Sequence, residues 1–357
     1  MMDWIVFEKV GKKFGTSWAI PELDLAIKKG EFFTLLGPSG CGKTTTLRLI
    51  AGLEIADAGK ISIAGKDVTR LPPPARRIAM VFQNYALYPH MTVFENISYP
   101  LRIRRVAKTE VLKRVEESAA RLRIGHLLER MPSRISGGEQ QRVAVCRAMV
   151  QEPNAFLFDE PLSNLDARLR LEARRFLRKI QKELGVTAVY VTHDQAEAMA
   201  MSDRVAVMQE GKLAQVGSPE EIYHRPSELF VAGFVGNFPM NFVEGEAQAQ
   251  DSKLFFRAGD FELEIPAGAN LKPGEKLTLS IRPEHIELSQ DPGQGLTGVI
   301  EDIEELGSEQ IITVSVSGKT LLARSTRKLG LKPRDKVGVQ IPGAMLHLFG
   351  RDGKRVN

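Results

Sequence analysis

The segment Gly37-Pro38-Ser39-Gly40-Cys41-Gly42-Lys43-Thr44 decides the fold of the first part of this 357-residue chain. It has the spacing G-x-x-x-x-G-K-T, and it lies between an apolar run at residues 31–36 and a helix-forming run at residues 45–51. Glycines in such a turn leave successive backbone N–H groups free to bind an anion, and the positive N-terminal end of the helix points at the same place. Strand, loop and helix together are the context that a phosphate-binding loop requires. The segment therefore predicts a nucleoside triphosphate site.

Two side chains of the loop have predictable roles in phosphate chemistry. Lys43 is placed to reach the β- and γ-phosphates, and the hydroxyl of Thr44 is placed to bind Mg²⁺. We therefore expect ATP-type chemistry with a magnesium ion at this loop.

Composition limits the class of protein. Hydrophobic residues make up 43% and charged residues 26% of the chain, which is ordinary for a soluble protein with two or three cores. No apolar run approaches the roughly 18 residues that a membrane-spanning helix needs, and residues 1–9 lack the pattern of a signal peptide. The two cysteines, Cys41 in the loop and Cys146 in a predicted helix, suit a reducing compartment without a disulfide. These features predict a cytoplasmic protein that does not cross a membrane by itself.

The net charge of +5 raises the question of nucleic-acid binding. Residues 243–357 contain 15 basic and 17 acidic residues, so the positive excess lies in the rest of the chain. The aromatic residues of that region are few and clustered, which is a poor platform for stacking bases; they are Phe255, Phe256, Phe261 and Phe349. We therefore predict no nucleic-acid partner, although a basic surface that faces phosphates or a membrane partner stays open.

The chain divides into regions with different patterns of predicted secondary structure. Strand-like runs and helices alternate over residues 1–90 and 151–235, and a mostly helical segment lies between them at about 91–150. This pattern predicts an α/β domain over residues 1–235 with a helical insert. Residues 236–357 instead contain short alternating segments broken by Gly and Pro, which predicts a separate all-β domain.

An internal repeat lies in the second region. Residues 271–277, LKPGEKL, recur as residues 331–337, LKPRDKV, and four apolar positions continue the parallel. Leu279, Ile281, Ile286 and Leu288 align with Val339, Ile341, Leu346 and Leu348. Two copies of one β-unit predict a small barrel-like module built from related halves.

A pair of carboxylates follows the apolar run at residues 155–158. Asp159 ends this predicted strand and can hold Mg²⁺ directly or through water, and Glu160 follows at the same strand tip. A carboxylate beside the γ-phosphate can orient the attacking water or accept its proton. We predict that Asp159 is a metal residue and that Glu160 is catalytic.

Two further polar residues end predicted strands. His193 follows the strand at residues 188–192 and could bind both a γ-phosphate oxygen and the water. Gln83 follows the strand at residues 78–82, and its amide is suited to contact Mg²⁺ and water. Neither residue type carries this assignment alone, so both depend on the phosphate loop and the carboxylates.

A second glycine pair opens another predicted helix at Ser136-Gly137-Gly138. It is a further anion-binding helix start, yet it has no lysine and lies far along the chain from the first loop. One nucleotide per chain with two phosphate-binding ends suggests that the second end binds the nucleotide of another copy.

These motifs together resemble the ATP-binding cassette of ABC transporters. The resemblance covers roughly residues 5–235 and rests on order, spacing and residue type. Its motifs are the loop at 37–44, Gln83, the segment Ser136-Gly137-Gly138-Glu139-Gln140-Gln141-Arg142, Asp159-Glu160-Pro161, Ser163-Asn164-Leu165-Asp166 and Thr192-His193-Asp194. The β-module, with Ile281-Arg282-Pro283-Glu284-His285, is similar to the C-terminal OB-like (TOBE) domain of bacterial import ATPases for maltose-like sugars, sulfate, polyamines and ferric iron.

The resemblance implies an architecture and a set of partners. It implies a P-loop NTPase cassette with a helical subdomain followed by an all-β OB-like barrel domain for dimerisation or regulation. Two copies would close head to tail over two ATP molecules on the cytoplasmic face of the membrane. The subunit would be peripheral and would serve two membrane-spanning permease subunits and an extracytoplasmic solute-binding protein.

The resemblance also implies roles for individual residues. Phe14 would stack on adenine, Asp166 would link the two sites, and the segment at residues 85–91 would meet the membrane subunits, although its aromatic residues could instead be core. The phosphates would be held by Ser39, Gly40, Cys41, Gly42, Lys43, Thr44 and Thr45, and in trans by Ser136, Gly137 and Gly138. Lys43, Gln83, Glu160 and His193 would be catalytic, and Thr44, Gln83 and Asp159 would hold the metal. The chain departs from the family pattern at Ile135, usually Leu, at Glu139, more often Gln, and at Phe14, where Tyr or Trp is frequent.

The solute is the weakest prediction. The segment His90-Met91-Thr92-Val93-Phe94-Glu95-Asn96-Ile97 resembles the sulfate and polyamine members of this family at least as much as the sugar members. The resemblance therefore implies sulfate or a related anion such as thiosulfate, with a sugar as the close alternative and a polyamine or ferric iron behind it. A soluble ABC ATPase of DNA repair or translation is disfavoured, because the chain has neither a second cassette nor a long coiled-coil insertion. A non-catalytic nucleotide sensor is disfavoured because Glu160 and His193 are both present.

Overall fold

The computed structural model describes residues 2–251, 253–266 and 271–357. The chain forms two compact units, an N-terminal unit Met1–Glu220 and a C-terminal unit Glu221–Asn357. The sequence placed this border later, at 235/236. The difference arises because helix α8, Leu229–Phe234, packs Ala232 against Met240 and Phe349 of the C-terminal unit.

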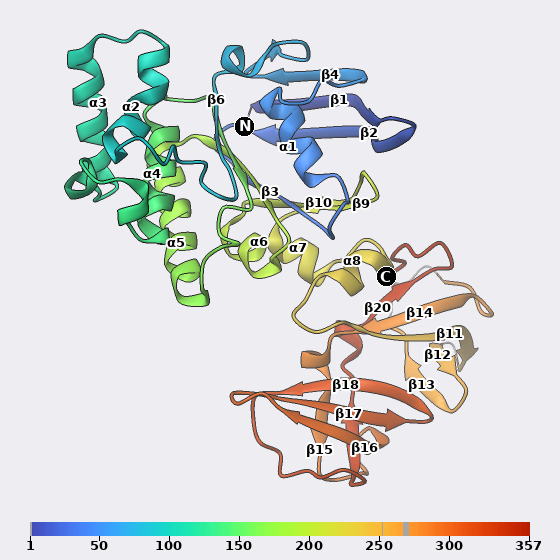
Figure 1. Ribbon diagram of the computed structural model, residues 1–357. Helices are drawn as coiled ribbons and strands as arrows, with labels where there is room; N and C mark the ends of the chain where they lie inside the picture. Colours follow the sequence, from blue (N-terminus) through green and yellow to red (C-terminus); the bar gives the residue numbers. More distant parts are fainter. Residues whose placement is uncertain (1, 252, 267–270) are drawn as a thin grey trace. The chain divides into compact units, whose positions relative to one another are not determined.

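A six-stranded sheet forms the centre of the N-terminal unit (Figure 1). Its strand order is β10-β9-β3-β8-β7-β6, in which all neighbours are parallel except the edge pair β9 and β10. Every residue of β8 is buried, as expected for a parallel strand that is covered on both faces. The strands are β3 Phe32–Leu36, β6 Ile78–Val81, β7 Ala155–Asp159, β8 Thr187–Thr192, β9 Arg204–Gln209 and β10 Lys212–Gly217.

An antiparallel sheet and one helix cover part of this centre. The sheet has the order β2-β1-β4-β5, with β1 Asp3–Phe14, β2 Ser17–Lys28, β4 Ala58–Ile63 and β5 Lys66–Asp67. Helix α1, Lys43–Ala51, contributes Leu47 and Ile50 to a core that also contains Phe7 of β1 and Leu157 of β7. The phosphate loop is thus followed by a helix that is anchored between the two sheets.

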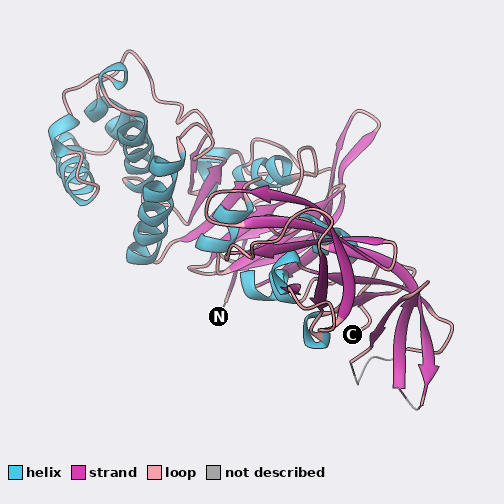
Figure 2. Cartoon of the chain, turned by 90° about the horizontal axis from the view of Figure 1, so that it is seen from below, coloured by secondary structure: helices cyan, strands magenta, loops and turns pink. Residues whose placement is uncertain are grey.

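Four helices form a layer on one side of the N-terminal unit, called the helical layer below (Figures 1 and 2). They are α2 Val93–Ile103, α3 Lys108–Arg121, α4 Gly137–Met149 and α5 Ala167–Leu184. Their apolar residues, such as Val115 and Val143, share a second core with Phe156 of β7. A short helix, α6 Gln195–Met201, follows β8. Helices α3 and α4 occupy the segments for which the sequence predicted helices.

Local sequence signals start and end these helices. Thr92 caps α2 in a capping box with Glu95, and the side chain of Asp166 accepts a hydrogen bond from the backbone of Leu169 at the start of α5. Helix α5 ends at Gly185, which has a φ of 61°. The helix ends therefore follow from short-range chemistry that the sequence displays.

The C-terminal unit begins within helix α7, Pro219–His224. It also contains helix α8 and two five-stranded antiparallel sheets. The sheet orders are β13-β12-β11-β14-β20 and β15-β19-β16-β17-β18. The elements are α7 Pro219–His224, β11 Asn241–Gln250, β12 Lys253–Ala258, β13 Phe261–Glu264, β14 Lys276–Ile281, β15 Glu287–Ser289, β16 Leu296–Glu305, β17 Gln310–Val316, β18 Lys319–Ser325, β19 Lys336–Gln340 and β20 His347–Phe349.

The internal repeat is present as two exchanged halves. Each copy is a strand, a 3-10 turn and a second strand: β14 and β15 in the first copy, β19 and β20 in the second. The first strand of each copy pairs with the second strand of the other, in matching register: Leu279 lies opposite Leu348, and Val339 lies opposite Leu288. The predicted relation between the halves is therefore a pseudo-twofold exchange, and neither half is complete alone.

His347 is a buried titratable group within this exchanged structure. Its side chain is 6% exposed, and its Nδ1 has no hydrogen-bond partner among the described residues. Burial lowers the pKa of His347 to about 4, and the positive charges of Arg355 and Arg282 act in the same direction. The folded chain therefore keeps this imidazole neutral at pH values where the unfolded chain protonates it.

Acidification should weaken the fold through His347. The free energy of unfolding should fall as pH drops from about 6.5 towards 4, with a loss of roughly 2 kcal/mol between pH 7 and pH 5 from this group. Denaturant unfolding of wild type and His347→Gln at both pH values measures it, and the variant should show a smaller pH effect whatever its stability at pH 7. The exposed His90→Gln serves as control, and equal pH effects in all three proteins would contradict this account.

Candidate functional site

The phosphate loop connects β3 to α1. Gly40 and Gly42 have positive φ values of 79° and 104°, and a Cβ at position 42 would lie 2.7 Å from Cδ1 of Ile20. Strand β2 thus packs against the loop and leaves room only for glycine there. The remaining predicted phosphate contacts, Ser39, Thr44 and Thr45, lie on the same loop and on the first turn of α1.

Lys43 lies at the centre of the loop. Its side chain is buried, and its Nζ donates to the carbonyl oxygens of Gly37 at 2.7 Å and Pro38 at 2.8 Å. Sγ of Cys41, also buried, is 3.7 Å from the same nitrogen. The loop therefore curls around one positive charge, to which a phosphate oxygen would bind in place of a carbonyl.

The structure brings Thr44 and Asp159 together. The hydroxyl of Thr44 donates to Oδ1 of Asp159 at 3.4 Å, although the two residues are 115 positions apart. Burial raises the pKa of Asp159, and the nearby charge of Glu160 adds to this effect while Arg48 opposes it. A hydroxyl and a carboxylate are oxygen ligands of the kind that Mg²⁺ prefers.

These two ligands suit magnesium better than a metal held by protein alone. The described part of the chain contains no group of three or more His, Cys, Asp or Glu residues that could enclose a metal ion. Mg²⁺ typically keeps several waters and binds one or two protein oxygens together with substrate phosphates. The residues present therefore fit a magnesium ion that arrives with the nucleotide.

Glu160 and His193 meet at the ends of neighbouring strands. Oε2 of Glu160 is 3.1 Å from Nδ1 of His193, beside a cavity of about 40 Å³. Glu160 has a φ of 46°, which is unusual for a residue with a side chain, and its backbone N–H donates to the carbonyl of Val191 in β8. The hydroxyl of Ser163 donates to the carbonyl of Glu160. The strained turn is thus held from both sides, as expected where a side chain must point in one direction.

Glu197 accepts hydrogen bonds from the strand that ends just before His193, and sequence reasoning missed it. Tyr190 and Thr192 each donate a hydroxyl hydrogen bond of 2.7 Å to Oε2 of Glu197, and burial raises the pKa of this carboxyl. Asp194 caps α6 by accepting from the backbone N–H of Glu197. The pattern D-x-x-E directly after His193 was the available signal, because it is typical of a helix start.

Other predicted residues lie apart from this cluster. The carbonyl of Gln83 accepts from Asn164, but among the described residues no hydrogen bond joins the side chain of Gln83 to Thr44 or Asp159. Phe14 ends β1, is 49% exposed, and has the Nζ of Lys12 5.2 Å from its ring centre. Asp166 caps α5.

Ser136, Gly137 and Gly138 form the start of α4 in the helical layer. Ser136 is the N-cap, and its described hydrogen bonds are formed with Glu139 and Gln140 and not with the phosphate loop. A Cβ on Gly138 would meet no atom within 4 Å, so this end of the helix is open. The chain therefore has two separate glycine-containing helix starts, one at the phosphate loop and one at Ser136.

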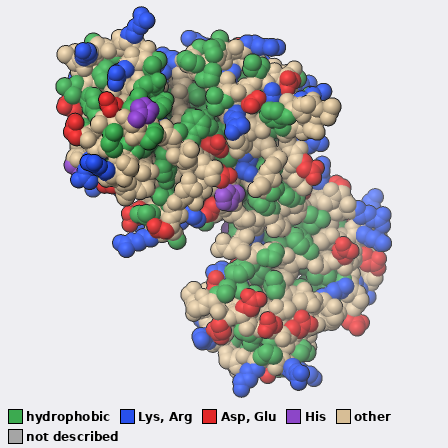
Figure 3. All heavy atoms as spheres, viewed as in Figure 1, with side chains coloured by type: hydrophobic (Ala, Val, Ile, Leu, Met, Phe, Trp, Pro, Cys, Tyr) green, Lys and Arg blue, Asp and Glu red, His purple; other side chains and the backbone are tan. Residues whose placement is uncertain are grey.

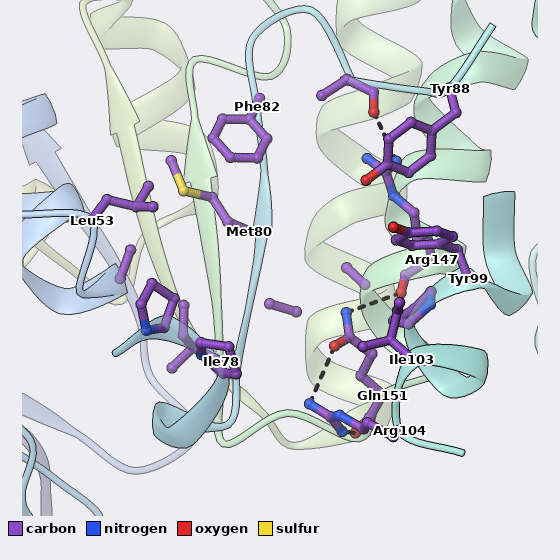
Figure 4. Close-up of a pocket in the computed structure, with 17 residues that line it drawn as sticks. Leu53, Ile78, Met80, Phe82, Tyr88, Tyr99, Ile103, Arg104, Arg147 and Gln151 are labelled. Atoms are coloured by element: carbon purple, nitrogen blue, oxygen red, sulfur yellow. Dashed lines mark hydrogen bonds between the residues drawn. The ribbon is translucent and has the colours of Figure 1, made fainter. Parts of the chain in front are cut away.

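A largely apolar groove, called the docking groove below, lies between the helical layer and the sheets (Figure 3). Its volume is about 420 Å³. Figure 4 shows Leu53, Ile78, Met80 and Phe82 on one wall and Tyr88, Tyr99 and Ile103 on the other. Ile103 is 66% and Leu53 49% exposed, a high exposure for large apolar side chains.

Two buried or half-buried polar residues fix the loop beside this groove. Arg147 of α4 donates to the carbonyls of Tyr85 and Ala86, and its guanidinium lies 5.7 Å from the ring centre of Tyr88. Asn96 of α2 accepts from the N–H of Tyr88 and donates to its carbonyl. The segment after Gln83 is thus attached to two helices of the helical layer.

A phosphate loop, a carboxylate at an adjacent strand end and a glutamate–histidine pair define an ATP-binding P-loop protein. The family descriptions that match the chain are "ABC transporter" over residues 20–163, "MalK OB fold domain" over 239–286 and "TOBE domain" over 279–349. The chain belongs to the ATP-binding proteins of ABC transporters, which are ATPases coupled to transport. The predicted fold class, a cassette with a helical subdomain plus a C-terminal OB-like β domain, is confirmed.

Relatives and a solved structure extend the comparison. The chain is 44% identical to an sn-glycerol-3-phosphate import ATP-binding protein of Agrobacterium fabrum, covering 99% of this chain and 95% of the relative. It is 46% identical to the trehalose/maltose import ATP-binding protein of Thermococcus litoralis, with 96% of each chain covered. The structure of cbiO1 from Clostridium perfringens, part of the ABC transporter complex cbiONQ, is 28% identical, with a TM-score of 0.58 over 62% of this chain and 91% of that one.

The names of these relatives, which refer to sugars and glycerol phosphate, support the sugar alternative better than the predicted preference for sulfate. The segment at residues 90–97, on which the preference for sulfate was based, lies at the start of α2. Thr92 and Glu95 form the capping box of α2, and Asn96 is fully buried while it holds the loop at Tyr88. These residues therefore have a structural role at the start of α2.

One structural finding bears on membrane association. Among the residues that the structure describes, no helix is both long and apolar enough to span a membrane.

Proposed function

We propose that two copies of this chain close head to tail over two ATP molecules and hydrolyse them to drive solute import. The contact between Glu160 and His193 next to the phosphate loop is the observation that carries this proposal. The second helix start, at Ser136, is open and forms no hydrogen bond to the chain's own loop, which suits binding of the partner copy's γ-phosphate. Asp166, at the exposed start of α5, would lie between the two sites.

The residues of one site would divide the chemistry among them. Backbone N–H groups of the loop and Lys43 would hold the phosphates, and Phe14 would stack on adenine. Glu160 would orient the attacking water and accept its proton, and His193, in contact with Glu160, would hold the γ-phosphate. Thr44 and Asp159, with Gln83, would hold Mg²⁺, which supplies charge neutralisation on the phosphates.

The docking groove would receive a short helix of a membrane-spanning permease subunit. Its width between two walls, its exposed Ile103 and Leu53 and its aromatic residues suit an amphipathic helix that inserts its apolar face. This contact would place the subunit peripherally on the cytoplasmic face of the membrane. An extracytoplasmic solute-binding protein would complete the import system.

Helix α4 would couple the groove to the nucleotide. Ser136 lies at its start, and Arg147, near its end, is bonded to the loop that lines the groove. A helix of this length, about 20 Å, moves as one body. Closure onto a partner's ATP would therefore shift the permease helix in the groove.

The solute class that we propose is a sugar or a glycerol phosphate. The named functions of the relatives support this class over an inorganic anion.

The variant Glu160→Gln should separate binding from hydrolysis. It should bind ATP and form a long-lived dimer, while hydrolysis falls on the order of 10²- to 10⁴-fold because the water loses its base. Light scattering with and without ATP measures the dimer, and phosphate release measures turnover. The exposed Glu116→Gln on α3 is the matched control and should behave as wild type; a Glu160→Gln variant that stays monomeric under ATP would refute head-to-tail closure.

A charge in the docking groove should uncouple the subunit from its permease. Ile103→Glu should abolish binding to the reconstituted membrane subunits, because a carboxylate would be buried against an apolar helix, while ATP binding by the isolated subunit stays normal. Leu112→Glu on the exposed face of α3, outside the groove, is the control. Normal complex formation by Ile103→Glu would show that the permease binds elsewhere.

Uptake by host cells tests the solute class. A chromosomal Glu160→Gln should abolish uptake of labelled sn-glycerol-3-phosphate, maltose or trehalose, and should leave labelled sulfate uptake at the level of the Glu116→Gln control. Loss of sulfate uptake alone would overturn the proposed class and leave the ATPase function intact.

A further inference from the structure

The start of α4 contains a hydrogen bond that an ordinary capping box does not need. The box itself is present: Oε2 of Glu139 accepts from the backbone N–H of Ser136 at 2.7 Å, and Ser136 Oγ accepts from the N–H of Glu139 at 3.4 Å. In addition, the hydroxyl of Ser136 donates to Oε2 of Glu139 at 2.8 Å.

The box at the start of α2 provides an internal comparison. Between Thr92 and Glu95, which are both described, the structure has the two reciprocal backbone bonds and no bond between hydroxyl and carboxylate. A cap can therefore form while the hydroxyl proton stays available. At α4 the same type of box holds that proton.

This bond conflicts with the role proposed for Ser136. A serine hydroxyl has one proton to donate, and Glu139 accepts it. Binding of the partner copy's γ-phosphate would require the hydroxyl to turn from Glu139 to a phosphate oxygen. The carboxylate would then stay beside the triphosphate, where its negative charge repels the phosphates.

The charge of Glu139 is well established by its surroundings. The backbone N–H of Ser136, followed by its hydroxyl, lowers the pKa of Glu139, and His126 and Arg130 act in the same direction. Glu139 is therefore a carboxylate at neutral pH, and it carries this charge at the open end of α4.

We infer that Glu139 is a positioning residue that raises the ATP concentration at which two copies close. It does so by holding the Ser136 hydroxyl and by placing a negative charge next to the partner's phosphates. This inference rests on the proposed function, because it needs Ser136 to bind ATP of the other copy. A chain with Glu139 at this position would need more ATP to close than one without the charge, which would reduce hydrolysis when nucleotide is scarce.

Dimer formation as a function of ATP tests the inference. In a Glu160→Gln background, Glu139→Gln keeps an oxygen for the cap but removes the charge, and should lower the half-maximal ATP concentration on the order of 3- to 10-fold. The shift should shrink at high salt, because exposed charges are screened. Glu95→Gln, at the other box, should leave the ATP requirement unchanged, and thermal unfolding checks that every variant is folded.

A second variant separates the charge from the hydrogen bond. Adding Ser136→Ala should reduce the gain from Glu139→Gln, because the two residues act through one bond and their effects are not additive. An unchanged or higher ATP requirement in Glu139→Gln would overturn the inference. If Glu160→Gln itself fails to dimerise under ATP, the proposed function fails instead, so the two failures are distinguishable.

Discussion

The site depends on the adjacency of three parallel strands, β3, β8 and β7, in the central sheet. Because parallel strands end at the same edge, the phosphate loop after β3, His193 after β8, and Asp159 and Glu160 at the end of β7 lie at one edge of the sheet. The hydrogen bond between Thr44 and Asp159 joins residues that only this arrangement could bring close. The helical layer, in contrast, contains the second helix start, at Ser136, whose cap bonds are formed with Glu139 and not with the phosphate loop.

Much of this could be predicted from the sequence, because the motifs depend on short-range chemistry. The spacing of the phosphate loop, the apolar runs before Asp159 and His193 and the change of texture near residue 236 are all local signals. They were sufficient for the fold class, and they name the candidate residues, whose roles stay predictions. The position of Gln83 is less determined, because a residue that follows a strand can turn its side chain in several directions.

The features that escaped prediction depend on contacts between distant residues. In the sequence, Glu197 is an ordinary helix residue. Only the structure shows that Tyr190 and Thr192 donate hydrogen bonds to it. In the sequence, Arg147 is one of several charged residues on a helix. In the structure it donates a hydrogen bond to the backbone carbonyl of Tyr85, 62 residues earlier in the chain. The solute is hard to predict for another reason: residues 90–97 form the start of α2, and a sequence pattern does not separate this local role from a role in specificity.

The exchange of strands in the C-terminal unit has a consequence for synthesis on the ribosome. Strand β14 cannot pair with its neighbour β20, His347–Phe349, until β20 has been synthesised. Strand β15 likewise cannot pair until β19 has been synthesised. Contacts between such distant segments form slowly, because the entropy cost of closing a long loop comes before the contacts can stabilise the fold. The N-terminal unit therefore finishes emerging and can fold while the C-terminal unit is still open, and the exposed edge of β14 is the surface that most needs protection during that interval.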